Sequence, residues 1–239
     1  MASFGKTISD SLKRLLFREL TVARVVGLSE HFMRVDFVAE GLRGVRCSPG
    51  DKVQIAFDGG PRTYTPFAFD SVRGALSVLL YLHGDGPSAR WAKGVREGAR
   101  VFAFGPRSSL ALAAEAAPIA LFGDETSFAV GRALLEARAG AGDCSFVFEV
   151  THASEAQRVL DTLGLPNAWI VERQADESHL VDVQARLRAA VEQNAETRLV
   201  LSGKAASIQA LRKGFKAESV AHAGQLVKAY WSPGKRGLD

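Results

Sequence analysis

The tetrapeptide Arg62-Thr63-Tyr64-Thr65 groups a cation, an aromatic ring and two hydroxyls in one short segment. In an extended segment, alternate side chains lie on one face and can meet a single ligand. Arg62 can pair with a pyrophosphate as a two-pronged donor, Tyr64 can stack on a flat ring, and the Thr65 hydroxyl can hydrogen-bond a ring nitrogen. A flavin dinucleotide is flat and anionic, so the pattern favours FAD; the alternative is an ordinary edge strand.

A glycine-rich turn follows in the block His83-Gly84-Asp85-Gly86-Pro87-Ser88-Ala89-Arg90-Trp91. Apolar residues 75–82 predict a strand before it, and Ser88 is a candidate cap for a short helix over residues 89–95. Glycine lets the backbone approach phosphate, and a helix start offers free N–H groups and the positive end of a dipole. Such a block taken alone is more often a plain turn, but its position after residues 62–65 predicts a phosphate site.

These segments and three further motifs stand in the order seen in siderophore-interacting proteins, which are ferric-siderophore reductases of the ferredoxin-reductase-like superfamily. The chain resembles this family from Leu20 to Gly234. The resemblance implies FAD as cofactor, NADH or NADPH as electron donor, ferredoxin as another candidate partner, and a ferric siderophore as substrate. The further motifs are Gly105-Pro106-Arg107, Gly123-Asp124-Glu125-Thr126 and Tyr230-Trp231-x-x-Gly234.

The resemblance also implies roles for individual residues. Thr65 and Lys228 are the expected catalytic residues, and Lys228, Lys235 and Arg236 are expected to bind the substrate. For the aromatic pair 230–231, simple packing is the alternative. The residues expected to bind FAD or the nucleotide donor are Arg62, Thr63, Tyr64, Thr65, His83, Gly86, Pro87, Ser88, Trp91, Gly123, Asp124, Glu125, Thr126, Tyr230 and Trp231.

The hydrophobic pattern divides the chain near residues 111–118. Residues 20–112 contain short alternating apolar runs separated by turn clusters, which predicts a small antiparallel barrel. The resemblance implies that this domain is a six-stranded FAD-binding barrel. Residues 118–239 alternate between apolar strands and helical segments, which predicts an α/β domain with a parallel sheet, like those that bind NAD(P)H. Its strands are expected at residues 119–122, 146–150, 168–171, 198–202 and 225–231, and its helices at 128–138, 153–163, 180–192 and 205–216.

Residues 1–19 precede the barrel as a separate extension. Ile8, Leu12, Leu15 and Leu16 recur at helical spacing among basic residues, which predicts a short amphipathic helix. We expect it to pack on the barrel or on a second subunit, although a membrane surface is an alternative.

Composition narrows the range of functions. The chain has 239 residues, 47% of them hydrophobic, and a net charge of +4 without a basic run typical of nucleic-acid binding. No apolar run reaches the length of a membrane span, so we expect a cytoplasmic protein without membrane contact; its oligomeric state stays open. Five histidines and two cysteines show no ligand spacing, so no bound metal is expected. The segment after Gly203 is rich in lysine and arginine, which would attract an anionic substrate.

The electron donor is the least determined feature. Glu149, at the end of the second predicted strand of the α/β domain, can hold a ribose hydroxyl and thereby favours NADH over NADPH. Related proteins carry Gly-Glu after the fourth strand, whereas this chain has Ser202-Gly203-Lys204, which reverses the local charge. Two other functions also remain open. One is a general flavin or ferredoxin-linked reductase with another acceptor, and the other is a non-catalytic protein that binds ferric siderophore or haem.

Overall fold

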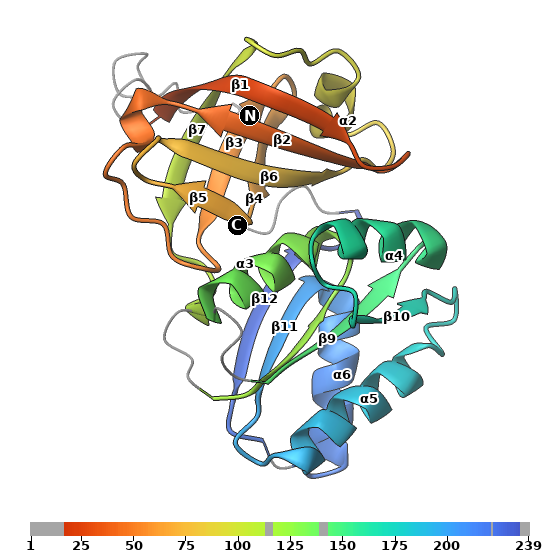
Figure 1. Ribbon diagram of the computed structural model, residues 1–239. Helices are drawn as coiled ribbons and strands as arrows, with labels where there is room; N and C mark the ends of the chain where they lie inside the picture. Colours follow the sequence, from red (N-terminus) through yellow and green to blue (C-terminus); the bar gives the residue numbers. More distant parts are fainter. Residues whose placement is uncertain (1–16, 113–116, 139–142, 221, 235–239) are drawn as a thin grey trace, which may run out of the picture.

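The computed structural model describes residues 17–112, 117–138, 143–220 and 222–234, which form two domains (Figure 1). The N-terminal domain is an antiparallel sheet that curls into a half-barrel, with strand order β4-β3-β7-β1-β2-β6-β5. Its strands are β1 (Phe17–Gly27), β2 (Phe32–Val38), β3 (Lys52–Phe57), β4 (Gly60–Tyr64), β5 (Ala68–Asp70), β6 (Ala75–Tyr81) and β7 (Arg100–Arg107), with the short helices η1 (Glu40–Leu42) and α2 (Pro87–Ala92).

The sheet curls around a core because several of its strands, β2 and β3 among them, have one apolar face. Val35 and Phe37 on β2, and Val53 and Ile55 on β3, point alternately into a core from which water is excluded. The antiparallel barrel predicted from the sequence is confirmed, but it has seven strands instead of six. The additional strand is β5, a segment of three residues that pairs with β6 and is too short to show a period.

The prediction for the helix of the glycine-rich block was wrong about its start. The helix begins at Pro87 with Gly86 as N-cap, not at Ala89 with Ser88 as cap. Proline fits the first helical position because its φ is already helical and it lacks the N–H that would be unpaired there. The Ser88 side chain instead hydrogen-bonds the Tyr64 hydroxyl.

The C-terminal domain has a five-stranded parallel sheet of order β10-β9-β8-β11-β12, as expected from the alternation of strands and helices. Helices α3 and α4 cover one face, and α5 and α6 cover the other. The elements are β8 (Ile119–Gly123), η3 (Glu125–Ser127), α3 (Phe128–Arg138), β9 (Cys144–Val150), α4 (Ala153–Thr162), β10 (Trp169–Glu172), α5 (Leu180–Gln193), β11 (Arg198–Lys204), α6 (Ala205–Ala217) and β12 (Gln225–Trp231).

A continuous apolar core joins the two domains. Phe32 and Phe67 of the half-barrel belong to the same buried cluster as Phe128 of α3, and the rings of Phe32 and Phe128 stack at 5.4 Å. Next to this contact, Glu155 of α4 accepts a 2.9 Å hydrogen bond from the backbone N–H of His31. The carboxyl ends of the parallel strands are therefore held against the barrel, and this is where ligands of open α/β sheets bind. No helix in the described part of the chain is both long and apolar enough to cross a bilayer.

Candidate functional site

The barrel side of the site is built by β4 and the threonine that follows it. Tyr64 is half-buried with its ring edge-on to Phe57 at 6.3 Å, and its hydroxyl bonds to Ser88. Burial raises the pKa of Tyr64 to about 12, so the phenol stays protonated at neutral pH. Thr65 is only 7% exposed and lies at the junction with the C-terminal domain.

Two guanidinium groups flank the turn between β3 and β4. A Cβ at Gly59 would come within 3.0 Å of Nη2 of Arg90, and one at Gly60 within 3.9 Å of Nη1 of Arg62. Arg62 also donates a 2.8 Å hydrogen bond to its neighbouring carbonyl, that of Pro61. Arg90 belongs to the block of residues 83–91 but was not predicted as a site residue, because sequence alone does not bring it next to Arg62.

The glycine-rich turn offers backbone groups, not side chains, to a ligand. Cβ atoms added at Gly84 or Gly86 would meet nothing within 4 Å, and Gly84 has a φ of +55°. No side chain caps the start of α2. Open backbone beside Arg62 and Arg90 is the donor set that a pyrophosphate requires, so these residues fit the diphosphate of FAD.

Other members of the block have packing roles in this structure. The Trp91 ring lies 5.1 Å from Phe57 and 6.4 Å from Phe37, within the barrel core. Pro87 is buried, whereas His83 is exposed, with its ring 5.4 Å from that of Tyr81. Contacts of these residues with a cofactor stay predictions.

The end of β12 connects the two domains. The Tyr230 hydroxyl hydrogen-bonds the side chain of Thr65, and burial raises the pKa of Tyr230 to about 12. Trp231 donates a 2.7 Å hydrogen bond from Nε1 to Oδ2 of Asp124. The structure thus brings together the end of the first motif, the aromatic pair and the loop after β8, which lie far apart in the sequence.

Asp124 caps the first helical turn after β8 and is fully buried. Its carboxylate accepts hydrogen bonds from the N–H and hydroxyl of Thr126 as well as from Trp231. Desolvation, and next the charge of Glu125, raise the pKa of Asp124 to about 6. Its position requires glycine at 203, where φ is +101° and a Cβ would lie 2.4 Å from Oδ2 of Asp124.

A buried polar cluster that the sequence analysis missed lies beside this carboxylate. Glu125, 3% exposed, accepts a 2.6 Å hydrogen bond from the Thr151 N–H and forms an ion pair with Arg173. The Arg173 guanidinium lies 5.9 Å from the centre of the Trp231 ring. Arg173 directly follows β10, so a search for side chains at the carboxyl ends of strands would have found it. Glu125 is therefore engaged in contacts within the protein.

The role proposed for Glu149 is not supported by its surroundings. Its side chain is fully buried, with Oε2 2.8 Å from Nε2 of His179 and Oε1 accepting a 2.8 Å hydrogen bond from Ser207. A carboxylate that is buried and already has partners in the core is not available to a ribose hydroxyl. Glu149 therefore no longer supports NADH over NADPH as the donor. Lys204, the departure noted after the fourth strand, pairs with Glu177 at 2.7 Å.

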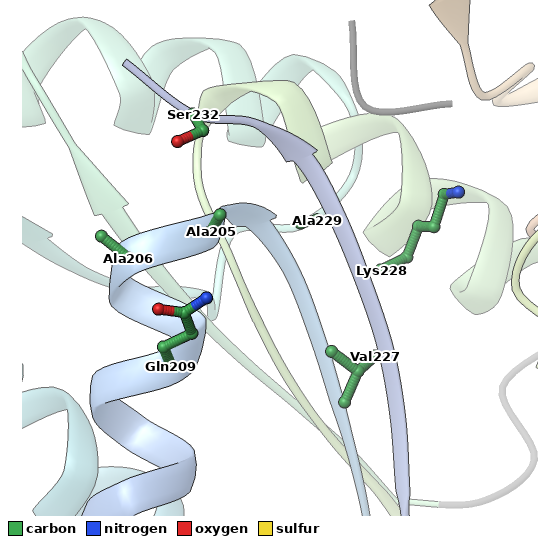
Figure 2. A pocket seen from close by; sticks show the side chains of 7 residues that line it. All are labelled: Ala205, Ala206, Gln209, Val227, Lys228, Ala229 and Ser232. Carbon is green, nitrogen blue, oxygen red and sulfur yellow. The ribbon is translucent and has the colours of Figure 1, made fainter. Parts of the chain in front are cut away.

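Lys228 lies on the same face of β12 as Tyr230 and is half-buried. Figure 2 shows its side chain directed away from α6. A hollow of about 450 Å³ lies between β12 and the start of α6, and Lys228, Val227 and Gln209 are among the residues that line it. Lys235, Arg236 and the predicted helix within residues 1–19, up to residue 16, lie outside the described residues.

Metal-ligating side chains are scattered over the described part of the chain. Within residues 17–234, apart from the short gaps, no three histidine, cysteine or acidic side chains are grouped so that they could hold a metal ion. Cys47 and Cys144 are free thiols, and burial raises the pKa of both.

Comparison with protein families finds two matches that follow the two domains. Residues 58–110 match the siderophore-interacting FAD-binding domain, and residues 116–234 match the siderophore-interacting protein model. The boundary between the matches falls in the segment where the fold changes from antiparallel to parallel sheet.

Individual relatives agree with these matches. The chain is 30% identical to the NADPH-dependent ferric-chelate reductase of Escherichia coli, over 40% of this chain and 47% of that protein. It is similar in structure to a siderophore utilization protein from T. fusca, with a TM-score of 0.70, 23% identity, and 93% of this chain and 95% of that chain covered. Phthalate dioxygenase reductase has the same fold, with a TM-score of 0.71 at 15% identity, over 92% of this chain and 70% of that one.

Proposed function

Because the chain belongs to the siderophore-interacting protein family, we propose that it is an FAD-dependent reductase that reduces ferric siderophores and so releases ferrous iron. The observation that carries the proposal is the hydrogen bond between Tyr230 and Thr65. It places the last strand of the C-terminal domain at the residue whose hydroxyl we expect beside the flavin. One site would then receive electrons from a donor and pass them to iron.

When bound, FAD would accept an electron pair as hydride and release electrons singly, which suits a ferric acceptor. The chain's own residues would bind and orient it. Arg62 and Arg90 would hold the pyrophosphate against the open backbone of Gly84 and Gly86, and Thr65 would offer its hydroxyl to the flavin ring. Tyr64 would provide an uncharged aromatic surface, because a tyrosine phenol is protonated at neutral pH, and burial raises its pKa further.

Lys228 is the residue that we propose for holding the ferric substrate. It projects from β12 on the side of Tyr230 and away from α6. Ferric complexes of catecholates and hydroxycarboxylates are anionic, so a lysine there would raise their local concentration. The protein itself need not ligate iron, since ferrous iron is held weakly by hard oxygen ligands and can dissociate after reduction.

We propose a pyridine nucleotide as the electron donor, delivered to the crevice beyond β8 and β11. The relative from E. coli is named an NADPH-dependent enzyme. With Glu149 sealed in the core, no residue described here favours NADH. A ferredoxin is the other candidate partner in electron transfer. Phthalate dioxygenase reductase, which shares the fold, transfers electrons from pyridine nucleotides to [2Fe-2S], so in that protein the iron–sulfur centre is the acceptor.

The visible spectrum of the purified protein is the first test. A yellow preparation, or one that takes up added FAD, is expected, whereas a colourless protein that does not bind FAD would contradict the proposal and favour a non-catalytic binding protein. Anaerobic titration with NADPH, NADH and reduced ferredoxin would then identify the donor. Turnover with ferric siderophores that is no faster than turnover with quinones or free flavins would favour the general reductase.

A further inference from the structure

The crevice of the parallel sheet is bridged by an ion pair between Lys204 and Glu177. Strands β8 to β10 add to the sheet in one direction and β11 and β12 in the other, so the order reverses between β8 and β11. Dinucleotides bind at such a reversal, beyond the carboxyl ends of the strands. Lys204 ends β11 and is the N-cap of α6. Glu177 lies in the loop that leads into α5, which packs on β8 and β9, and its Oε1 is 2.7 Å from Nζ of Lys204.

The loop of residues 173–179 is fixed at its two ends and exposed in the middle. At one end the Arg173 guanidinium pairs with a buried carboxylate, and at the other the ring of His179, only 4% exposed, is hydrogen-bonded in the core. The residues between these ends are exposed, apart from the half-buried Glu177. Glu177 has a φ of +61°, in the left-handed region that residues other than glycine rarely adopt. The tip of the loop can therefore change conformation without disturbing the buried contacts at its ends.

The two partners of the ion pair differ in their access to water. The side chain of Lys204 is 15% exposed, so its ammonium group is partly removed from water and is stabilised by a nearby anion. The side chain of Glu177 is 40% exposed and can turn into solvent, where its carboxylate is hydrated. Lysine binds phosphate groups as a compact positive charge. A phosphate that enters the crevice can therefore take the place of the Glu177 carboxylate.

We propose that Lys204 binds a phosphate group of the nucleotide donor and that Glu177 occupies Lys204 until the donor binds. Entry of the donor breaks the ion pair and turns Glu177 outward, while the ends of the loop stay in place. The competing carboxylate weakens binding of the donor according to the fraction of molecules in which the pair is formed. The inference rests on the proposed function; it adds the residue that recognises the donor and the contact that opposes its entry.

The test uses Lys204→Gln and Glu177→Gln, with Arg188→Gln and Glu218→Gln as matched controls. Arg188 and Glu218 also form an ion pair in the C-terminal domain, with Nη1 3.2 Å from Oε2. Glu218 is the C-cap of α6, so this pair lies at the end of the helix away from Lys204. For the FAD-loaded protein, calorimetric titration with NADP⁺ and NAD⁺ measures binding without turnover. Stopped-flow experiments with NADPH and NADH measure reduction of the flavin.

Lys204→Gln is expected to weaken binding of the oxidised nucleotide, and to raise KM for the reduced one, by about tenfold, because a charge-assisted contact is lost. A loss confined to NADP⁺ and NADPH would assign Lys204 to the ribose phosphate, and a loss with all four nucleotides would assign it to the pyrophosphate. Glu177→Gln is expected to tighten binding by about twofold to fivefold, since the carboxylate no longer competes. Lys204→Arg should recover most of the affinity, and both controls should resemble wild type.

Four results would overturn the inference and leave the proposed function intact. They are unchanged binding in Lys204→Gln, an equal loss in Arg188→Gln, weaker binding in Glu177→Gln, and a wild-type flavin that ferredoxin reduces but neither nucleotide does. Reduction of ferric chelates by protein whose flavin has been reduced with dithionite tests the proposed function separately, because that step does not need the donor. If the wild-type protein binds no FAD, or its reduced flavin does not reduce ferric chelates, the proposed function fails, and the inference fails with it.

Discussion

The buried carboxylate of Asp124 should make the stability of this protein fall as the pH rises from about 4 to about 7. Desolvation raises the pKa of Asp124 from 3.8 to about 6 in the folded protein. Between these values the folded state holds a proton that the unfolded chain has released, so each step up in pH favours unfolding. The stabilisation is complete below the unfolded pKa and is lost as the pH passes the folded one. This rise in the pKa corresponds to about 3 kcal/mol in the free energy of unfolding. Because Asp124 is fully buried, solvent screening does not reduce the effect.

The variant Asp124→Asn separates this effect from the rest of the protein. Asparagine keeps the shape but cannot ionise, and one of its two polar atoms is a donor. That donor would face either Trp231 Nε1 or the Thr126 N–H, each of which now donates to the carboxylate, at a cost of about 1 to 3 kcal/mol. At pH 7 wild-type Asp124 is a buried charge, and the variant avoids the free energy that this burial requires. This gain offsets the cost of the asparagine donor, so the variant should be about as stable as wild type. At pH 4.5 only the cost remains, so the variant should be less stable.

Urea unfolding of both proteins at several pH values gives the difference in free energy of unfolding as a function of pH. The stability of wild type relative to the variant should decline by about 2 to 3 kcal/mol between pH 4 and 7 and be constant above that. Fluorescence of Trp231 should change over the same range, since its indole binds the titrating group. Asp58→Asn, in the exposed turn after β3, is the control. A difference that stays constant from pH 4 to 7, or one that rises with pH, would refute the reasoning.

Three further substitutions test the site. Arg62→Ala should weaken FAD binding by about 1.5 to 3 kcal/mol through loss of a charge-assisted contact, measured by titrating flavin-free protein with FAD; unchanged affinity would contradict the assignment. Lys228→Ala should raise KM for anionic ferric chelates and leave flavin reduction by the donor unchanged in stopped-flow experiments, whereas equal losses in both half-reactions would make Lys228 structural. Gly203→Ala should destabilise the fold by about 1 to 3 kcal/mol in urea unfolding, because the added Cβ would lie 2.4 Å from Asp124 and φ is +101°; a protein as stable as wild type would show that the loop relaxes freely.

Some parts of the fold could be predicted residue by residue because their signals are local. Alternating apolar residues on β2 and β3 report one buried face, and the short apolar runs of β8 and β11 report strands covered on both faces. The strand β5 escaped prediction because three residues carry no period. The helix α2 was placed two residues late because Ser88 looked like a cap, whereas its hydroxyl is used by Tyr64.

The sequence by itself determined the order of the two domains, the residue types that stand together at residues 62–65 and the position of an acidic loop directly after a strand. Tertiary structure alone decided which charged side chains are bonded inside the protein and which face solvent. Glu149 is sealed by His179 and Ser207, and Arg173 lies over Trp231. The physical reason is that period and propensity depend on neighbours along the chain. Burial, ion pairing and pKa depend instead on residues that meet only after both sheets have formed and packed together.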